Sequence, residues 1–151
     1  MKTPEEIKEL AWLRLREAEI LSANGMHDGA FYLAGYSVEL ILKAKICQRI
    51  GVPNIFDEQS KNELNSGISI IRNSLKTHNL NVLLIYSGLK DAFETEKADN
   101  QVLFKTNSLL FGNWDEKCRY KPCGYMKSQD VENLIALLHD ENGLLKWIEA
   151  N

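Results

Sequence analysis

Hydrophobic side chains recur three to four positions apart along most of the chain. The first such segment follows Thr3-Pro4-Glu5-Glu6, a capping box in which Thr3 is the expected N-cap and Pro4 the first helical residue. The repeat continues to Asn24-Gly25, a pair typical of a helix end. The pattern therefore predicts a first helix between these two signals.

The next segment is apolar on nearly all sides. Asp28 is the expected cap, and Gly51 is the expected terminator after a helix reaching about Ile50. A helix that is hydrophobic all round is typical of the centre of a bundle.

The rest of the chain shows weaker signals. We expect a polar connection over residues 51–66 and then a short helix or an extended piece over residues 68–75. Thr77 is the expected N-cap of a helix that ends near Ser87-Gly88, and a further helix is expected from Asp91 to about Leu110. A charged loop over residues 112–127 precedes a last helix capped by Ser128, which Asn142-Gly143 breaks or bends. No stretch alternates as a strand does, so the prediction is an all-α fold.

Composition limits the classes of protein to consider. The chain has 151 residues, 44% of them hydrophobic, which suits a single domain over residues 1–151. Its net charge of −3 argues against a dominant electrostatic hold on nucleic acid but allows a local basic patch. Early acidic residues replace the apolar core of a signal peptide, and no run approaches a membrane span.

The three cysteines, Cys47, Cys118 and Cys123, are an odd number without secretory context. They are expected to be free thiols in a reducing cytoplasm. Cys118 and Cys123 lack the further ligands of a zinc site, and no glycine-rich phosphate loop is present, so neither a metal nor a cofactor is expected.

One helical stripe of polar side chains stands out on the second predicted helix. Tyr32, Tyr36, Glu39 and Lys43 follow steps of four, three and four, and Glu39 precedes Lys43 in the favourable order for an ion pair. The stripe is either the solvated side of a core helix or the lining of a groove that holds a ligand or a partner.

Three motifs resemble, in the same order, those of HEPN domains (higher eukaryotes and prokaryotes nucleotide-binding). Residues 29–44 resemble the second helix of that family, residues 76–80 its Thr-His-Asp-Leu start of a middle helix, and Arg119-Tyr120 its Arg-Tyr segment. The resemblance covers roughly residues 4–150. It implies an up-and-down bundle of four to five helices that commonly dimerises, and roles as an RNase toxin, a partner of a minimal nucleotidyltransferase, or a nucleotide- or RNA-binding module in defence.

The chain departs from the catalytic members of that family, which carry an arginine followed after four to six residues by a histidine near the last long helix. Gly124, Tyr125 and Met126 occupy the positions after Arg119 where that histidine would stand. One formal match remains, Arg72 with His78, at a place where the family has no catalytic pair. The simpler interpretation puts His78 in the first turn of a helix with local hydrogen bonds.

A basic cluster with interleaved tyrosines lies in the predicted loop before the last helix. It suits contacts to phosphates and bases, although such loops are most often only solvated. Its members are Lys117, Arg119, Tyr120, Lys121, Tyr125 and Lys127.

The sequence therefore predicts a non-catalytic, cytoplasmic binding module for a nucleotide, an RNA or a partner protein such as a nucleotidyltransferase, and a homodimer. One alternative is a metal-independent ribonuclease that uses His78 with Arg72 or Arg119. The other is a purely architectural dimer. The expected groove is formed by Tyr32, Tyr36, Glu39, Lys43, His78, Arg119 and Tyr120.

Overall fold

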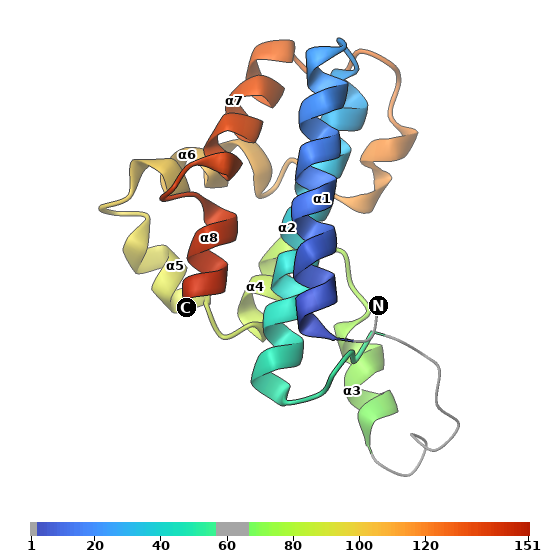
Figure 1. Ribbon diagram of the computed structural model, residues 1–151, viewed down its shortest axis with the longest axis vertical. Helices are drawn as coiled ribbons and strands as arrows, with labels where there is room; N and C mark the ends of the chain where they lie inside the picture. Colours follow the sequence, from blue (N-terminus) through green and yellow to red (C-terminus); the bar gives the residue numbers. More distant parts are fainter. Residues whose placement is uncertain (1–2, 57–66) are drawn as a thin grey trace.

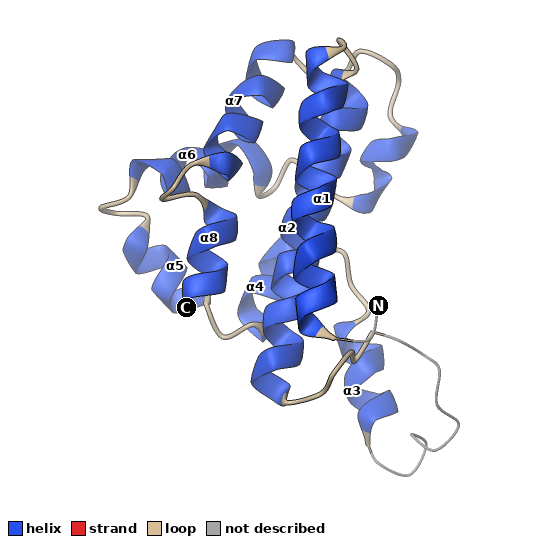
Figure 2. Ribbon diagram, in the orientation of Figure 1, coloured by secondary structure: helices blue, strands red, loops and turns tan. Residues whose placement is uncertain are grey.

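A computed structural model describes residues 3–56 and 67–151, and within these ranges all regular structure is helical (Figure 2). Two long helices, α1 (Pro4–Ala23) and α2 (His27–Ile50), form an antiparallel hairpin around which the shorter helices are arranged (Figure 1). The all-α prediction is thus confirmed. Most of the expected polar connection, residues 57–66, lies outside the described residues.

The first helix begins where local chemistry predicts. The Thr3 hydroxyl accepts a hydrogen bond from the Glu6 amide, and Pro4 occupies the first helical position, where its missing N–H costs nothing. The helix ends at Asn24-Gly25, and Gly25 has a φ of +77°.

Helix α2 ends at Gly51 in the left-handed conformation, as predicted, but Asp28 does not cap its start. Met26 is the N-cap residue, and Asp28 lies inside the first turn. The Asp28 carboxylate accepts hydrogen bonds from the amides of Gly124 and Met126 instead. Asp28 therefore holds a distant loop in place. The expected role of Asp28 as a helix cap did not predict this contact.

Two short helices follow, α3 (Ile68–Leu75) and α4 (Leu80–Tyr86). The prediction of Thr77 as the cap of α4 is wrong. Asn79 takes that role and accepts from the amides of Asn81 and Val82, while the Thr77 hydroxyl accepts from the Asn79 amide.

The expected helix from Asp91 to Leu110 is divided into α5 (Lys90–Glu96) and α6 (Gln101–Leu110). The chain turns at residues 97–100, and the Asn100 side chain caps α6 through the amides of Val102 and Leu103. A strong cap inside an otherwise helical pattern starts a new helix here.

The loop before the last helices contains a 3₁₀ helix, η2 (Glu116–Tyr120). Helix α7 (Ser128–His139) has Lys127 as its N-cap, so the prediction of Ser128 in that role is wrong by one residue. Asn142-Gly143 does break the last segment, and α8 (Leu144–Ala150) follows.

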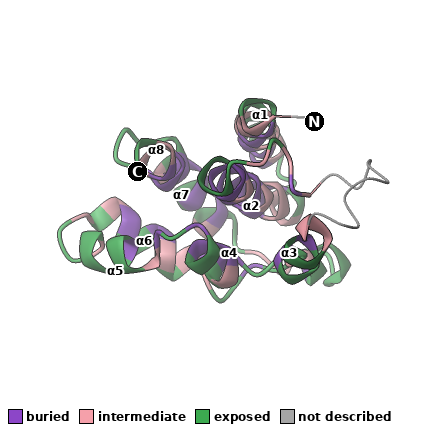
Figure 3. Cartoon of the chain, turned by 90° about the horizontal axis from the view of Figure 1, so that it is seen from below, coloured by how far each residue is buried: buried purple, intermediate pink, exposed green. Residues whose placement is uncertain are grey.

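The hydrophobic core surrounds α2. Its side chains from Ala30 to Cys47 are buried on most sides, between α1 on one face and α4, α7 and α8 on others (Figure 3). None of the helices in the described ranges is both long and apolar enough to cross a bilayer.

Candidate functional site

A buried carboxylate lies at the centre of the polar stripe on α2. The Glu39 side chain is 1% exposed, and Lys43 Nζ lies 2.5 Å from its Oε1. His78 Nδ1 lies 3.0 Å from Oε1 and 3.1 Å from Oε2. The expected ion pair of Glu39 with Lys43 is present, and these two donors offset the cost of burying the charge.

His78 reaches this carboxylate from the segment that leads into α4. It precedes that helix, and its partner is 39 positions away in sequence, so the expectation of local hydrogen bonds is wrong. Because a carboxylate only accepts, the Nδ1–H of His78 must donate to it. The imidazole is 51% exposed, and Nδ1 is the ring nitrogen that contacts Glu39.

His78 also lines a cavity of about 490 Å³ between the start of α4 and the segment before η2. Lys76 and Asn79 lie on the α4 side of the cavity, and Trp114 and Lys117 lie on the other. Residues more than 30 positions apart in sequence thus form one concave, mostly polar site.

Trp114 fixes the second wall of this cavity against α2. Its indole packs on Gly35 so closely that a Cβ there would lie 2.3 Å from the ring, and its Nε1–H donates to the Tyr32 carbonyl at 3.0 Å. No pattern in the sequence singles out Trp114. The run of small residues around Gly35 was the one signal that some large group approaches α2 at this point.

Tyr32 and Tyr36 extend the polar stripe of α2 from Glu39 towards the start of the helix. The rings of Tyr32 and Tyr36 stack at 6.3 Å, and Tyr32 also stacks on Trp114. Burial, and then the charge of Glu39, raise the pKa of Tyr36 above its ordinary value, so this phenol stays neutral.

Arg119 and Tyr120 lie at the other end of the stripe. Arg119 Nη1 donates to the Tyr32 hydroxyl at 3.4 Å, and the guanidinium lies 5.0 Å from the ring of Tyr120, which is 75% exposed. Tyr32 precedes Glu39 by seven residues, about 10 Å along a helix. The predicted groove residues therefore form an extended band with two polar ends rather than one tight cluster.

Arg72, the other residue of the formal nuclease match, is 6% exposed, and its Nε donates to the carbonyl of Ile55. This contact ties α3 to the segment after α2. Arg72 and His78 have different partners, and the geometry assigns Arg72 a structural role.

The predicted basic cluster is on the surface around η2. Lys117, Arg119 and Lys121 are exposed, and Lys121 Nζ lies 5.1 Å from the centre of the Tyr125 ring. Burial raises the pKa of Tyr125 well above its ordinary value, so its phenol is neutral too.

The cysteines are free thiols; Cys47 and Cys118 are buried and Cys123 is exposed. Over residues 3–56 and 67–151, the histidine, cysteine and acidic side chains form no group of three or more that would hold a metal ion.

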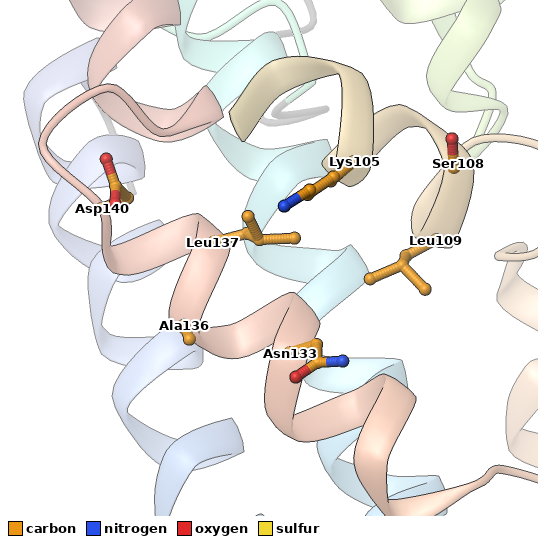
Figure 4. A pocket seen from close by; sticks show the side chains of 7 residues that line it. All are labelled: Lys105, Ser108, Leu109, Asn133, Ala136, Leu137 and Asp140. Carbon is orange, nitrogen blue, oxygen red and sulfur yellow. The ribbon is translucent and has the colours of Figure 1, made fainter. Parts of the chain in front are cut away.

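A second cavity, of about 530 Å³, lies between α6 and α7. Leu109 and Leu137 point into it, and Lys105 extends across it (Figure 4). None of the residues predicted from the sequence lines it, so the candidate site remains the cavity at His78.

Compared with known proteins, the chain matches no protein-family model, no curated protein and no solved structure. The HEPN resemblance therefore rests on the sequence motifs alone.

Proposed function

We propose that the protein is a cytoplasmic, non-catalytic, HEPN-like module that binds a nucleotide, free or at the end of an RNA, in the cavity at His78. The observation that carries the proposal is the half-exposed imidazole of His78, held by the buried Glu39 carboxylate inside a polar cavity. A pre-positioned polar group in a concave site is the usual mark of a ligand pocket.

The surroundings suit both parts of a nucleotide. The imidazole and the ammonium group of Lys117 are donors for a phosphate. On the neighbouring turn, the Tyr120 ring is exposed and Arg119 lies against it, an arrangement on which bases stack. The overall negative charge of the protein favours a local contact over an extended nucleic-acid surface.

Isothermal titration calorimetry with the four 5′-nucleoside monophosphates, and fluorescence anisotropy with a short labelled RNA, test this proposal. We expect binding by the wild type, at least tenfold weaker binding by Lys117→Ala, and a similar loss in Tyr120→Ala for the RNA. Lys146→Ala is the control because Lys146 is a half-buried lysine on α8 that does not line the cavity and pairs with Glu141. Equal affinity of all three variants and the wild type, or no binding by any of them, would contradict the proposal.

The contact between Glu39 and His78 favours a second candidate function, a metal-independent ribonuclease. A carboxylate on Nδ1 orients an imidazole so that Nε2 can accept a proton, as a general base on a 2′-hydroxyl must. Arg119 would be the cation that stabilises the developing charge on the phosphate, since Arg72 is occupied inside the fold.

An RNA-cleavage assay in EDTA, with tRNA and a structured RNA, separates the two functions. Cleavage that disappears in both His78→Ala and Arg119→Ala would establish the ribonuclease and exclude the non-catalytic module. Intact RNA at high protein concentration would exclude the ribonuclease.

For partners, we propose a homodimer formed through the outer face of α1. Leu13 and Ile20 are 44% and 58% exposed and are seven residues apart, which is two turns on one helical face. Light scattering should give a dimer mass for the wild type and a monomer mass for Ile20→Glu. A purely architectural dimer would show the same masses without binding nucleotide.

Coexpression with a nucleotidyltransferase would test the partner that the HEPN resemblance implies.

A further inference from the structure

The charged groups that surround His78 are of both signs. Glu39 and Lys43 face it from α2, and the remaining groups line the cavity with it. The described set is Glu39, Lys43, Lys76, Asp115, Glu116 and Lys117.

A proton on the imidazole adds one positive charge to this site. An imidazolium therefore attracts an anion more strongly than a neutral His78 does. Tyr36, beside Glu39, adds no charge because its phenol is neutral. Histidine is the side chain that ordinarily changes charge between about pH 5 and 8.

Glu39 accepts the Nδ1–H of His78 in either protonation state of the ring. Both of its oxygens lie within 3.1 Å of Nδ1, and a charged donor strengthens such a hydrogen bond. The same hydrogen bond directs the second N–H of an imidazolium, at Nε2, away from Glu39.

We propose that this cavity captures the terminal phosphate of its ligand with the imidazolium form of His78, so that binding takes up one proton from the solvent. The inference rests on the proposed function and adds the ligand group that is recognised and the protonation that recognition requires. In the complex, Nε2–H donates to a phosphate oxygen, while Lys117, which also lines the cavity, attracts the phosphate.

The proposal selects a phosphomonoester over a phosphodiester. A terminal phosphate carries a charge of about −1.5 to −2 at pH 7, whereas a diester carries a single charge. The larger charge gains more from the imidazolium, so it drives the proton uptake more strongly.

Calorimetry in two buffers of different ionisation enthalpy, HEPES and Tris at pH 7.5, measures the proton uptake directly. The probes are the four 5′-nucleoside monophosphates, the corresponding nucleosides and the 3′,5′-cyclic nucleotides. For the monophosphate that binds, we expect an uptake approaching one proton and an affinity at least tenfold above that of its cyclic form. Because the complex holds one more proton than the free components, the affinity should fall as pH rises, by up to about tenfold per pH unit.

Two substitutions and one control isolate the histidine. His78→Gln keeps a polar side chain at a half-exposed position, and we expect it to abolish the uptake and to show only the pH dependence of the ligand's own phosphate. Glu39→Gln should reduce the uptake. His139→Gln is the control because His139 is a similarly exposed histidine, 39% exposed, with Glu19 as its carboxylate neighbour.

The possible failures are distinct. If no monophosphate binds, the proposed function is lost. If a monophosphate binds with the same heat in both buffers, or if His78→Gln leaves the uptake unchanged, this inference is wrong while the proposed function stands.

Discussion

At the scale of single residues, the closest packing around the site is that of Gly35 against Trp114. The indole occupies the space that a side chain would fill, and its N–H bond to the Tyr32 carbonyl fixes its angle. This contact holds Trp114, which lines the cavity at His78, against α2.

We predict that Gly35→Ala lowers the free energy of unfolding by about 1–3 kcal/mol, because the methyl group must displace a buried ring. The matched control is Gly29→Ala on the same helix, where the nearest atom, Leu21 Cδ1, lies 3.4 Å from the added Cβ. That substitution should stabilise the protein by up to about 1 kcal/mol, because alanine loses less backbone entropy in a helix. Urea unfolding of both variants checks the pair, and equal effects would refute the packing argument.

The thiols give a second prediction at this scale. Cys123 is exposed, whereas burial leaves Cys47 with no exposed surface and raises the pKa of its thiol, so the reactive thiolate is scarce. A thiol reagent at pH 8 should therefore modify one cysteine rapidly in the native protein and all three in guanidinium chloride. Cys123→Ser should remove the rapid phase, and a rapid phase that persists would show that a buried thiol is accessible.

At the scale of helices, polar caps decide where the shorter elements begin. Asn79 and Asn100 each accept two amide hydrogen bonds at the first turn of a helix. The apolar repeat runs through the division between α5 and α6, because periodicity reports which face is buried and not where a turn interrupts it. Asparagine is a good cap and an ordinary loop residue, so its presence alone did not predict this division.

We predict that Asn100→Ala destabilises the protein by about 1 kcal/mol or more, through loss of the cap of α6. Asn100→Asp keeps the acceptor but loses the Nδ2 donor, which bonds to the Asn142 carbonyl at 3.2 Å. Thermal unfolding should rank the wild type first, Asn100→Asp second and Asn100→Ala third. An Asn100→Ala variant as stable as the wild type would contradict the role of the cap.

At the scale of the whole molecule, the segment between α6 and α7 is fastened across α2 at three points. These are Trp114 on Gly35, Arg119 on the Tyr32 hydroxyl, and the amides of Gly124 and Met126 on the Asp28 carboxylate. The segment carries one wall of the cavity and the basic surface of η2, so these contacts position the candidate site.

We predict that Asp28→Ala speeds the hydrogen exchange of the Gly124 and Met126 amides at least tenfold while exchange in α1 is unchanged, because Asp28 holds this loop and not its own helix. Mass spectrometry of peptides covering residues 112–127 measures the change. Asp130→Ala is the control, since Asp130 is an acid in the first turn of α7. Unchanged exchange in Asp28→Ala would mean that the other two contacts suffice.

The sequence by itself determined the helical class, the first helix with its capping residues, the glycine end of α2 and the pairing of Glu39 with Lys43. Each of these depends on residues within one or two helical turns, where spacing and capping chemistry are sufficient. Only the tertiary structure decided that His78 donates to Glu39, that Asp28 holds residues 124–126, that Trp114 rests on Gly35 and that Arg72 is buried against Ile55. These contacts join segments 17 to 98 positions apart, so spacing along the sequence does not pair them. Packing around α2 decides them, because it determines which distant groups come within hydrogen-bonding reach.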